Sequence, residues 1–213
     1  EKGWFETDIS YYSEEHMKIR CALYEKEEGR KSSAMIHIGE IPDDSIIEDY
    51  LRKYSAVYCL EPRGTGKNRM EPGCWFYTGD EIQNEEASYC CNADMLGRSV
   101  LGMMVHDTLS LQKMIYETCG DVELSIYGRE ENAITALFAA LIGNIPHVRL
   151  DRLLASYRSF IDNKTHCWSP SIFVNGLLAN FDIPDLLRAL ATADVSVCGL
   201  LDQRKKLTGI RII

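Results

Sequence analysis

One continuous stretch, residues 122 to 143, constrains the fold of this chain more than any other part of its sequence. It opens with residues 122 to 127, where Val, Leu, Ile and Tyr favour a short β-strand. A polar break from Gly128 to Asn132 follows, and the small, apolar residues from Ala133 to Leu141 then favour a helix. The order strand, tight turn, helix predicts that the strand and the helix pack closely around the turn.

The turn has the frame of a nucleophile elbow, the strand-to-helix turn of α/β-hydrolases with the pattern G-x-S-x-G. Gly128 holds the place of the first glycine, whereas Glu130 holds the nucleophile position and Asn132 the place of the last glycine. Asparagine tolerates unusual backbone angles better than most residues, so the turn is expected to survive. A carboxylate cannot become a serine-type alkoxide, and the frame therefore supports the fold more than the activity. A second interpretation of Glu130 is that its charge stabilises the N-terminus of the following helix.

Parallel strands with connecting helices are predicted along most of the chain. Residues 4–12 and 17–25 alternate like an antiparallel pair. Ser33–Ile38, a helix over Pro42–Lys53 and the strand Tyr54–Leu60 form a parallel strand-helix-strand unit. Further expected elements are a long irregular segment over residues 61–94, a helix over 95–117, strands at 146–150 and 195–201, and a helix start near Pro184. The prediction is an α/β fold with a mostly parallel sheet flanked by helices, in one domain that includes all 213 residues.

Loops at the carboxyl ends of parallel strands are where α/β proteins place their sites, so the residues there are candidates. His37 and Gly39 end a buried strand where an α/β-hydrolase supplies one oxyanion-hole N–H, and the Glu131 amide would supply the other. An ordinary strand-end histidine beside a turn glycine is the alternative. Arg63 follows the next strand in a loop that lacks the Walker pattern. The aromatic residues Trp75 and Tyr77 either line a pocket or pin a long loop to the core.

Composition excludes several classes of partner. The net charge of −9 argues against nucleic acid and anionic membranes, which require basic surfaces. No apolar run reaches the 18 residues of a transmembrane helix. The eight cysteines form no C-x-x-C pair; they are read as mostly buried thiols, with one disulfide involving Cys74, Cys90 or Cys91 left open. Neither a metal nor a cofactor is expected. Because the chain begins with Glu1, we expect it to be a piece of a longer protein.

Several segments, taken in order, resemble the C-terminal α/β-hydrolase domains of bacterial proteins named as acetyl xylan esterases, which are similar to glucuronoyl esterases. The resemblance covers most of residues 18 to 202. The segments that carry it are Arg63-Gly64-Thr65-Gly66, Leu96 to Met103, Tyr127-Gly128-Arg129, Leu153 to Tyr157 and Asp182 to Ala191.

This resemblance implies a Ser-His-acid triad that cleaves esters on plant polysaccharides, and a secreted or periplasmic location. Asp202, after the last strand, matches the acid position, but Glu130 replaces the serine and no histidine follows Asp202. The prediction is therefore a domain without serine-hydrolase catalysis, whose partners are a carbohydrate, a small ester or other domains of the same longer chain.

Two alternatives keep the chain an enzyme. In the first, Glu130 attacks an ester directly as a carboxylate nucleophile. In the second, a serine other than the elbow residue is the nucleophile, Ser99, Ser125 or Ser156, with His106 or His166 as its base.

Overall fold

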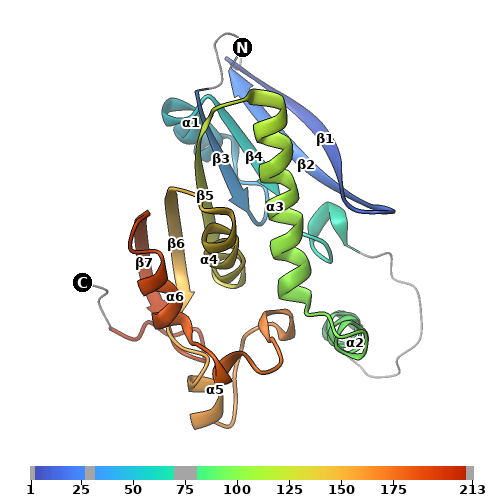
Figure 1. Cartoon of the computed structure of the whole chain (residues 1–213), viewed down its shortest axis with the longest axis vertical. Helices are drawn as coiled ribbons and strands as arrows, with labels where there is room; N and C mark the ends of the chain where they lie inside the picture. Colours follow the sequence, from blue (N-terminus) through green and yellow to red (C-terminus); the bar gives the residue numbers. More distant parts are fainter. Residues whose placement is uncertain (1–2, 27–31, 70–80, 210–213) are drawn as a thin grey trace.

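Seven strands form one mixed sheet, flanked by helices on both faces (Figure 1). The structure is a computed structural model that describes residues 3–26, 32–69 and 81–209, and for residues 81–85 it describes the backbone alone. The strands are β1 (Trp4–Glu14), β2 (Met17–Lys26), β3 (Ser33–Ile38), β4 (Ala56–Leu60), β5 (Glu123–Arg129), β6 (His147–Leu154) and β7 (Asp194–Leu201). The helices are α1 (Asp44–Lys53), α2 (Glu81–Met95), α3 (Val100–Cys119), α4 (Glu131–Gly143), α5 (Ser159–Asp162) and α6 (Ile183–Ala189).

The strand order in the sheet is β1-β2-β4-β3-β5-β6-β7. β1 and β2 form the expected antiparallel pair, and β2 runs antiparallel to β4. All the other neighbouring strands are parallel, so β3, β4, β5, β6 and β7 end at the same edge of the sheet. This arrangement confirms the predicted α/β fold. It also gathers the turns after β3, β5, β6 and β7 where sites of such sheets lie.

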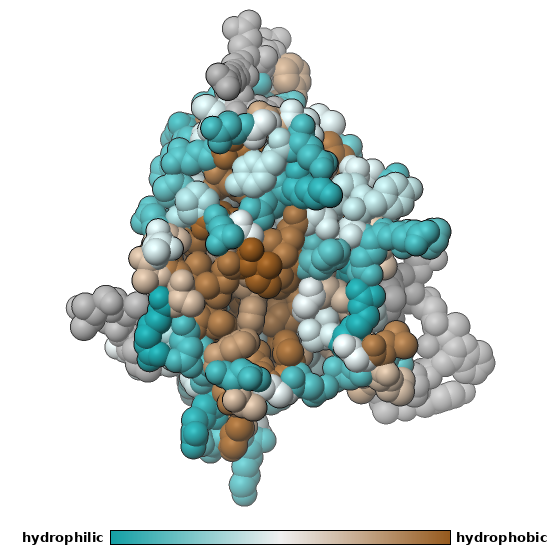
Figure 2. All heavy atoms as spheres, in the orientation of Figure 1, coloured by the Kyte–Doolittle hydropathy of each residue, from teal (hydrophilic) through white to brown (hydrophobic). Residues whose placement is uncertain are grey.

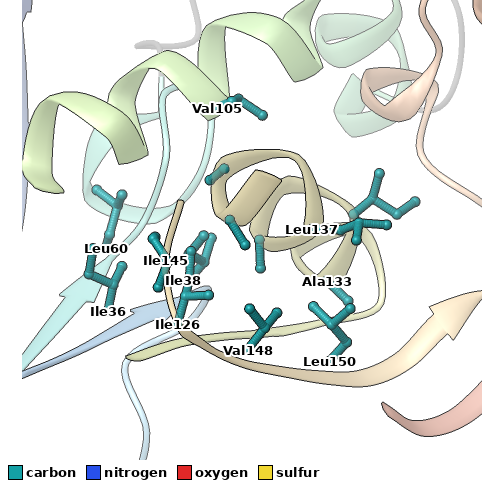
Figure 3. Packing of buried hydrophobic residues seen from close by; sticks show 14 of the residues in the cluster. Ile36, Ile38, Leu60, Val105, Ile126, Ala133, Leu137, Ile145, Val148 and Leu150 are labelled. Carbon is teal, nitrogen blue, oxygen red and sulfur yellow. The ribbon is translucent and has the colours of Figure 1, made fainter. Parts of the chain in front are cut away.

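The main hydrophobic core lies between the sheet and the helices α3, α4 and α6 (Figure 1). Helix α4 is apolar nearly all round, because it packs against both β5 and β6 and also against α3. Figure 3 shows Ala133 and Leu137 of α4 facing Ile126, Val148 and Leu150 of the sheet. The apolar run that the sequence places after the elbow is thus the central helix of the fold.

On the opposite face of the sheet, α1 packs mainly over β2 and β4. Ile47 and Leu51 of α1 pack there with Trp4, Tyr24 and Val57 in a second, smaller core. The alternation of β6 puts Val148 and Leu150 in the main core, so His147, Arg149 and Asp151 lie on the α1 side of the sheet. That side of β6 is therefore polar, and no described helix covers it.

Three boundaries differ from the sequence prediction. Residues 81–94, expected to be irregular, belong to α2, and the helix expected from Met95 begins at Val100, where the Ser99 hydroxyl accepts a hydrogen bond from the Gly102 amide. The turn around Gly97, whose φ is 70°, separates α2 from α3. Strand β6 continues to Leu154 because its last residues pair with β7, a contact between distant segments that local sequence does not reveal.

The structure also shows whether the described cysteines are free and whether a described helix could cross a membrane. Cys90 and Cys91 are free thiols, so the described part of the chain has no disulfide at these positions; Cys74, Trp75 and Tyr77 lie outside the described residues. None of the described helices combines the length and the apolar character that crossing a bilayer requires.

Candidate functional site

The turn between β5 and α4 has the backbone of a nucleophile elbow. Glu130 has φ 53° and ψ −119°, a conformation that L-residues rarely adopt. Its amide donates a hydrogen bond to the Asp151 carbonyl of β6 at 2.9 Å. Gly128 is required for close packing, since a Cβ there would lie 2.2 Å from the Asn132 carbonyl oxygen. The frame predicted from Gly128, Glu130 and Asn132 is therefore a strained strand-to-helix turn.

Gly39 lies next to this elbow, as its place after β3 predicts. A Cβ added to Gly39 would be 3.0 Å from the side-chain nitrogen of Asn132, and its φ is 134°. Its amide, however, donates to the Leu60 carbonyl at 3.0 Å. The Glu131 amide belongs to the first turn of α4, where N–H groups lack an intrahelical acceptor. Of the two proposed oxyanion-hole donors, Gly39 thus already has an acceptor in this structure.

Two cations hold the Glu130 carboxylate. The Lys205 ammonium donates to its Oε2 at 2.9 Å, and Arg152 Nε lies 3.2 Å from its Oε1. The Arg152 contact is an ion pair without hydrogen-bond geometry, since that buried Nε has no hydrogen-bond acceptor within the described structure. Partial burial raises the pKa of Glu130, but the hydrogen bond and charge of Lys205, together with Arg152, outweigh it and hold the pKa below its usual range. Glu130 is therefore ionised at neutral pH.

Lys205 connects Glu130 to its helix neighbour. The ammonium also pairs with Glu131 at 2.7 Å and lies 5.2 Å from the centre of the Trp168 ring, within the range of a cation–π contact. Burial lowers the pKa of Lys205, and the hydrogen bonds that its ammonium donates to Glu131 and Glu130 more than compensate, so that the pKa is raised. The nucleophile position is thus part of a compact ionic cluster of two carboxylates and two cations.

Asp202 follows β7, where the resemblance places a triad acid, but its carboxylate organises the local turn. Its Oδ1 accepts hydrogen bonds from the amides of Arg204 at 2.8 Å and Lys206 at 2.9 Å. Its carbonyl accepts from the indole N–H of Trp168 at 2.9 Å. The turn places Lys205, with φ 58°, toward the elbow. The loop of the predicted acid therefore brings a lysine to Glu130.

Arg63 belongs to a buried network of charged and polar side chains. Its guanidinium is buried against Asp107 of α3 and also pairs with Glu14 at 2.8 Å. Its Nη2 donates to the hydroxyl of Ser13 at 3.0 Å. This network joins the β1–β2 hairpin, the turn after β4 and α3. The sequence interpretation of Arg63 as a pocket residue rested on its loop alone, and charge pairing across 44 residues is invisible at that level.

His37 faces the α1 side of the sheet. Its ring stacks on Tyr127 with centroids 4.9 Å apart, and Tyr50 of α1 lies beside it at 5.8 Å. Its Nε2 contacts the Glu40 carbonyl at 3.2 Å. Burial lowers the pKa of His37 to about 4, so the ring is neutral at physiological pH. These contacts fit the alternative of a packed strand-end histidine.

The alternative serine nucleophiles have other partners. Ser99 caps α3, Ser125 is buried in β5, and the Ser156 hydroxyl donates to Asp182. The two proposed bases are also engaged elsewhere: His106 contacts the Ser13 carbonyl at 2.9 Å, and His166 packs against Phe160 and Phe173. Within the described structure no contact joins either histidine to one of these serines. Nor do the described residues include a cluster of three or more His, Cys, Asp or Glu side chains able to hold a metal.

Among the hollows of the described surface, two border the sheet or the helix α4, and both lie away from the elbow. The larger, of about 950 Å³, is bordered by α1 and by the polar side of β5, β6 and β7. The smaller, of about 330 Å³, is apolar and lies between α3 and α4, with Leu101, Val105 and Phe138 in its lining. Figure 2 shows apolar side chains gathered in a central depression on the face that carries α3 and α4.

Comparison with solved structures identifies the fold. A proposed acetyl xylan esterase from Bacteroides fragilis superimposes with a TM-score of 0.72 at 10% identity, over 94% of this chain. Prolyl oligopeptidase B from Galerina marginata matches with a TM-score of 0.54 at 12% identity over 76% of the chain. An acylaminoacyl peptidase from Pyrococcus horikoshii matches with a TM-score of 0.51 at 11% identity over 75%. At such identities the likeness concerns the fold alone.

The chain spans 60% of the length of the Bacteroides protein, 22% of the oligopeptidase and 25% of the acylaminoacyl peptidase. No family model matches the sequence, and no curated protein matches it.

Local sequence patterns do not identify Lys205 and Arg152 of the ionic cluster, nor Trp168 beside Lys205. Their signals are weak, since Lys205 stands in a surface-like run of basic residues and Arg152 in an ordinary strand pattern. A positive charge three residues after the predicted acid, together with a carboxylate at the nucleophile position, is the sequence pattern that points to Lys205. What the geometry and the comparisons establish together is that this chain has the α/β-hydrolase fold.

Proposed function

We propose that this chain is a non-catalytic α/β-hydrolase-like domain, in which an ionic cluster occupies the place of a serine-hydrolase site. The observation that carries the proposal is the double pairing of Glu130 at the elbow with Lys205 at 2.9 Å and Arg152 at 3.2 Å. A serine nucleophile needs a base that takes its proton and a free oxyanion-hole donor. Here the side chain is an ionised carboxylate, no histidine of the described residues contacts the elbow, and the Gly39 amide already donates to the Leu60 carbonyl.

The cluster also has a structural purpose that explains its composition. A carboxylate near the first turn of a helix is favoured by the helix dipole, and Glu130 and Glu131 both lie at the start of α4. Two adjacent half-buried carboxylates repel each other, and Lys205 between them removes that repulsion. Its contacts link the turn after β7 to the elbow. Binding of a carbohydrate or ester, or packing against another domain of a longer chain, is the role we propose for such a domain.

A second candidate function is ester hydrolysis with Glu130 as nucleophile, and the elbow geometry favours it. The φ and ψ of Glu130 are those that present a side chain at the apex of a strand-to-helix turn. For attack, a carboxylate oxygen must be released from Lys205 or Arg152. Their pairing lowers the pKa of Glu130 and reduces its nucleophilicity at the same time.

The two candidates are separated by hydrolysis of a chromogenic acetyl ester. Glu130→Gln keeps the size of the side chain and removes its charge, and Glu130→Ser introduces the hydroxyl of the elbow frame. We expect the parent chain and Glu130→Gln to release chromophore at the same rate as a heat-unfolded sample, which reports direct reaction with surface amines. Parent activity well above this background that is lost in Glu130→Gln establishes the nucleophile candidate and refutes the first.

Glu130→Ser tests the remaining machinery. Because no histidine contacts the elbow within the described residues, the variant is expected to stay at background. A gain of turnover in Glu130→Ser shows that a base and an oxyanion hole are present, and it contradicts the role of the ionic cluster as a replacement for the whole site. Circular dichroism of each variant ensures that folded proteins are compared.

A further inference from the structure

The larger hollow of the described surface combines features that its position on the sheet does not require. It has a volume of about 950 Å³, the upper end of the range of small-molecule sites. Its floor is the α1 side of β5, β6 and β7, and its wall is the flank of α1. Parallel sheets are ordinarily apolar on both faces, because helices cover both. Here the floor carries Ser125, Arg149 and Ser196 instead, so the surface is suited to water or to a polar ligand.

The acidic and the basic side chains that line the hollow differ in their ion pairing. Asp49 pairs with Arg52 at 2.8 Å, and Glu123 and Asp194 both contact His147, at 2.8 and 3.3 Å. Every carboxylate of the lining therefore has a cationic or protonatable partner. Arg149 and Lys53, in contrast, form no ion pair with any described carboxylate.

This imbalance stands out in a chain whose net charge is −9, where acidic partners are abundant. The imbalance favours an anion as the occupant.

The exposed Arg149 lies at the end of an aromatic row. Its guanidinium carbon lies 5.9 Å from the centre of the Tyr127 ring, and Tyr127 is stacked in turn on His37. Tyr50 of α1 lies 6.4 Å from Tyr127. In the sheet register Arg149 stands between Tyr127 and Ser196. A planar cation above a tyrosine ring, with a serine next to it in the sheet, suits an oxyanion with several oxygens, and phosphate is a group that Arg binds with two hydrogen bonds at once.

The rings give the hollow a second recognition element. Tyr50, Tyr54 and Tyr127 all contribute to its lining. Tyrosine faces bind flat or ring-shaped groups with little loss of side-chain entropy, because a tyrosine has few rotatable bonds. Their neighbourhood with Arg149 points to a ligand that carries a ring and an anionic group within one small molecule.

We propose that this hollow binds a small organic phosphate, with the phosphate at Arg149 and the attached ring against the tyrosines. Nucleotides and sugar phosphates share this chemistry, and the proposal concerns what they share. The site lies on the face of the sheet that α1 borders, and it does not depend on the state of the elbow.

The proposal is tested by titrating the protein with AMP, glucose phosphate, adenosine, glucose and inorganic phosphate, followed by two-dimensional NMR of the backbone amides. We expect saturable shifts of amides in β5, β6 and α1 with AMP, glucose phosphate or both. Adenosine, glucose and inorganic phosphate should each bind about tenfold or more weakly, because each lacks one of the two recognition elements. A preference for AMP identifies a nucleotide site, and a preference for glucose phosphate identifies a sugar phosphate site.

Arg149→Gln is the decisive variant, and Arg188→Gln is its control, since Arg188 is exposed on α6 and pairs only with Asp185 among the described residues. We expect Arg149→Gln to weaken binding about tenfold or more and Arg188→Gln to leave it unchanged. Lys53→Met supplies a second test at an exposed helix end, where folding is not at risk, and it should weaken binding of the phosphate compounds only. Absence of saturable shifts, equal binding by Arg149→Gln, or equal affinity for inorganic phosphate would overturn the proposal.

Discussion

Glu130 combines a strained backbone with a half-buried charge, and the two features have separate origins. The φ of 53° is imposed by the passage from β5 into α4 around Gly128. The ion pairs come from Lys205, 75 residues further along the chain, and from Arg152. Because the backbone strain and the ion pairs have different origins, different substitutions of Glu130 can measure the two effects separately.

The strain is measured by replacing Glu130 with alanine and with glycine. Both variants lose the carboxylate, so their difference reports the backbone. We expect Glu130→Gly to be more stable than Glu130→Ala by about 1 kcal/mol, because glycine adopts positive φ without cost. Urea unfolding provides the measurement. The same pair at Glu131, which is helical, should show the opposite order, with alanine more stable. Equal stabilities of Glu130→Gly and Glu130→Ala would mean that the turn relaxes to a backbone conformation that alanine adopts without strain.

A titratable residue at the other edge of the sheet gives a pH prediction. His147 lies between Glu123 and Asp194, and the hydrogen bond to Glu123, supported by Asp194, raises its pKa. A raised folded-state pKa adds stability below the unfolded pKa of about 6.5, and this stability is lost as the pH rises through the folded value. NMR titration of the imidazole should place its pKa above 6.5.

Glu123→Gln should bring the pKa of His147 closer to its ordinary value, because Glu123 is the largest contributor to the shift. A pKa of His147 at or below 6.5 in the parent protein would contradict the ion pairs across the three strands.

At the scale of elements, the β1–β2 hairpin is anchored to the rest of the fold by charge as well as by apolar contacts. Arg63, at the end of β4, and Asp107, in the middle of α3, form a pair in which both side chains are almost fully buried. The hydroxyl of Tyr11 in β1 donates to the Asp107 carbonyl at 2.8 Å. These contacts fix α3 across the hairpin.

Arg63→Met should lower the free energy of unfolding by about 3–5 kcal/mol, because Asp107 is left as a buried, unpaired charge. Arg52→Met removes a comparable arginine–aspartate pair whose side chains are 74% and 68% exposed. It should cost less than about 1 kcal/mol. Chemical unfolding of the two variants gives the comparison. Similar losses would show that burial of the Arg63 pair does not govern its contribution.

At the scale of the whole molecule, one sheet joins all the described strands, and its main core includes residues from Tyr11 to Leu201. The two tryptophans of the described residues lie in different cores. Trp4 of β1 packs with the α1 cluster, whereas Trp168 belongs to the main core near the carboxyl ends of the strands. They therefore report on distant parts of the same sheet.

We expect this sheet to unfold in one cooperative transition. In a Trp75→Phe background, Trp4→Phe and Trp168→Phe each leave one tryptophan as a reporter. In each variant the fluorescence midpoint should coincide with the midpoint from far-ultraviolet circular dichroism. A fluorescence transition that precedes the circular dichroism transition in one variant would divide the molecule into two cooperative units.

Local patterns in the sequence determined the elements and their class. The alternation of β1 and β2, the apolar runs of β3 and β4, and the strand-turn-helix order around Gly128 predict an α/β fold, because each depends on near neighbours in the chain. The elbow position of Glu130 follows from the same local frame. Periodicity does not predict α2, and it places the start of α3 at Met95 instead of Val100.

Only the tertiary structure decided what surrounds the candidate residues. Lys205 reaches Glu130, Arg63 meets Asp107 and Arg149 stacks on Tyr127 through contacts between segments 22 to 75 residues apart. A charged side chain has the same local sequence signal whether it is solvated, paired or part of a site. Its partner is chosen by the order of strands in the sheet, and that order is a property of the folded chain.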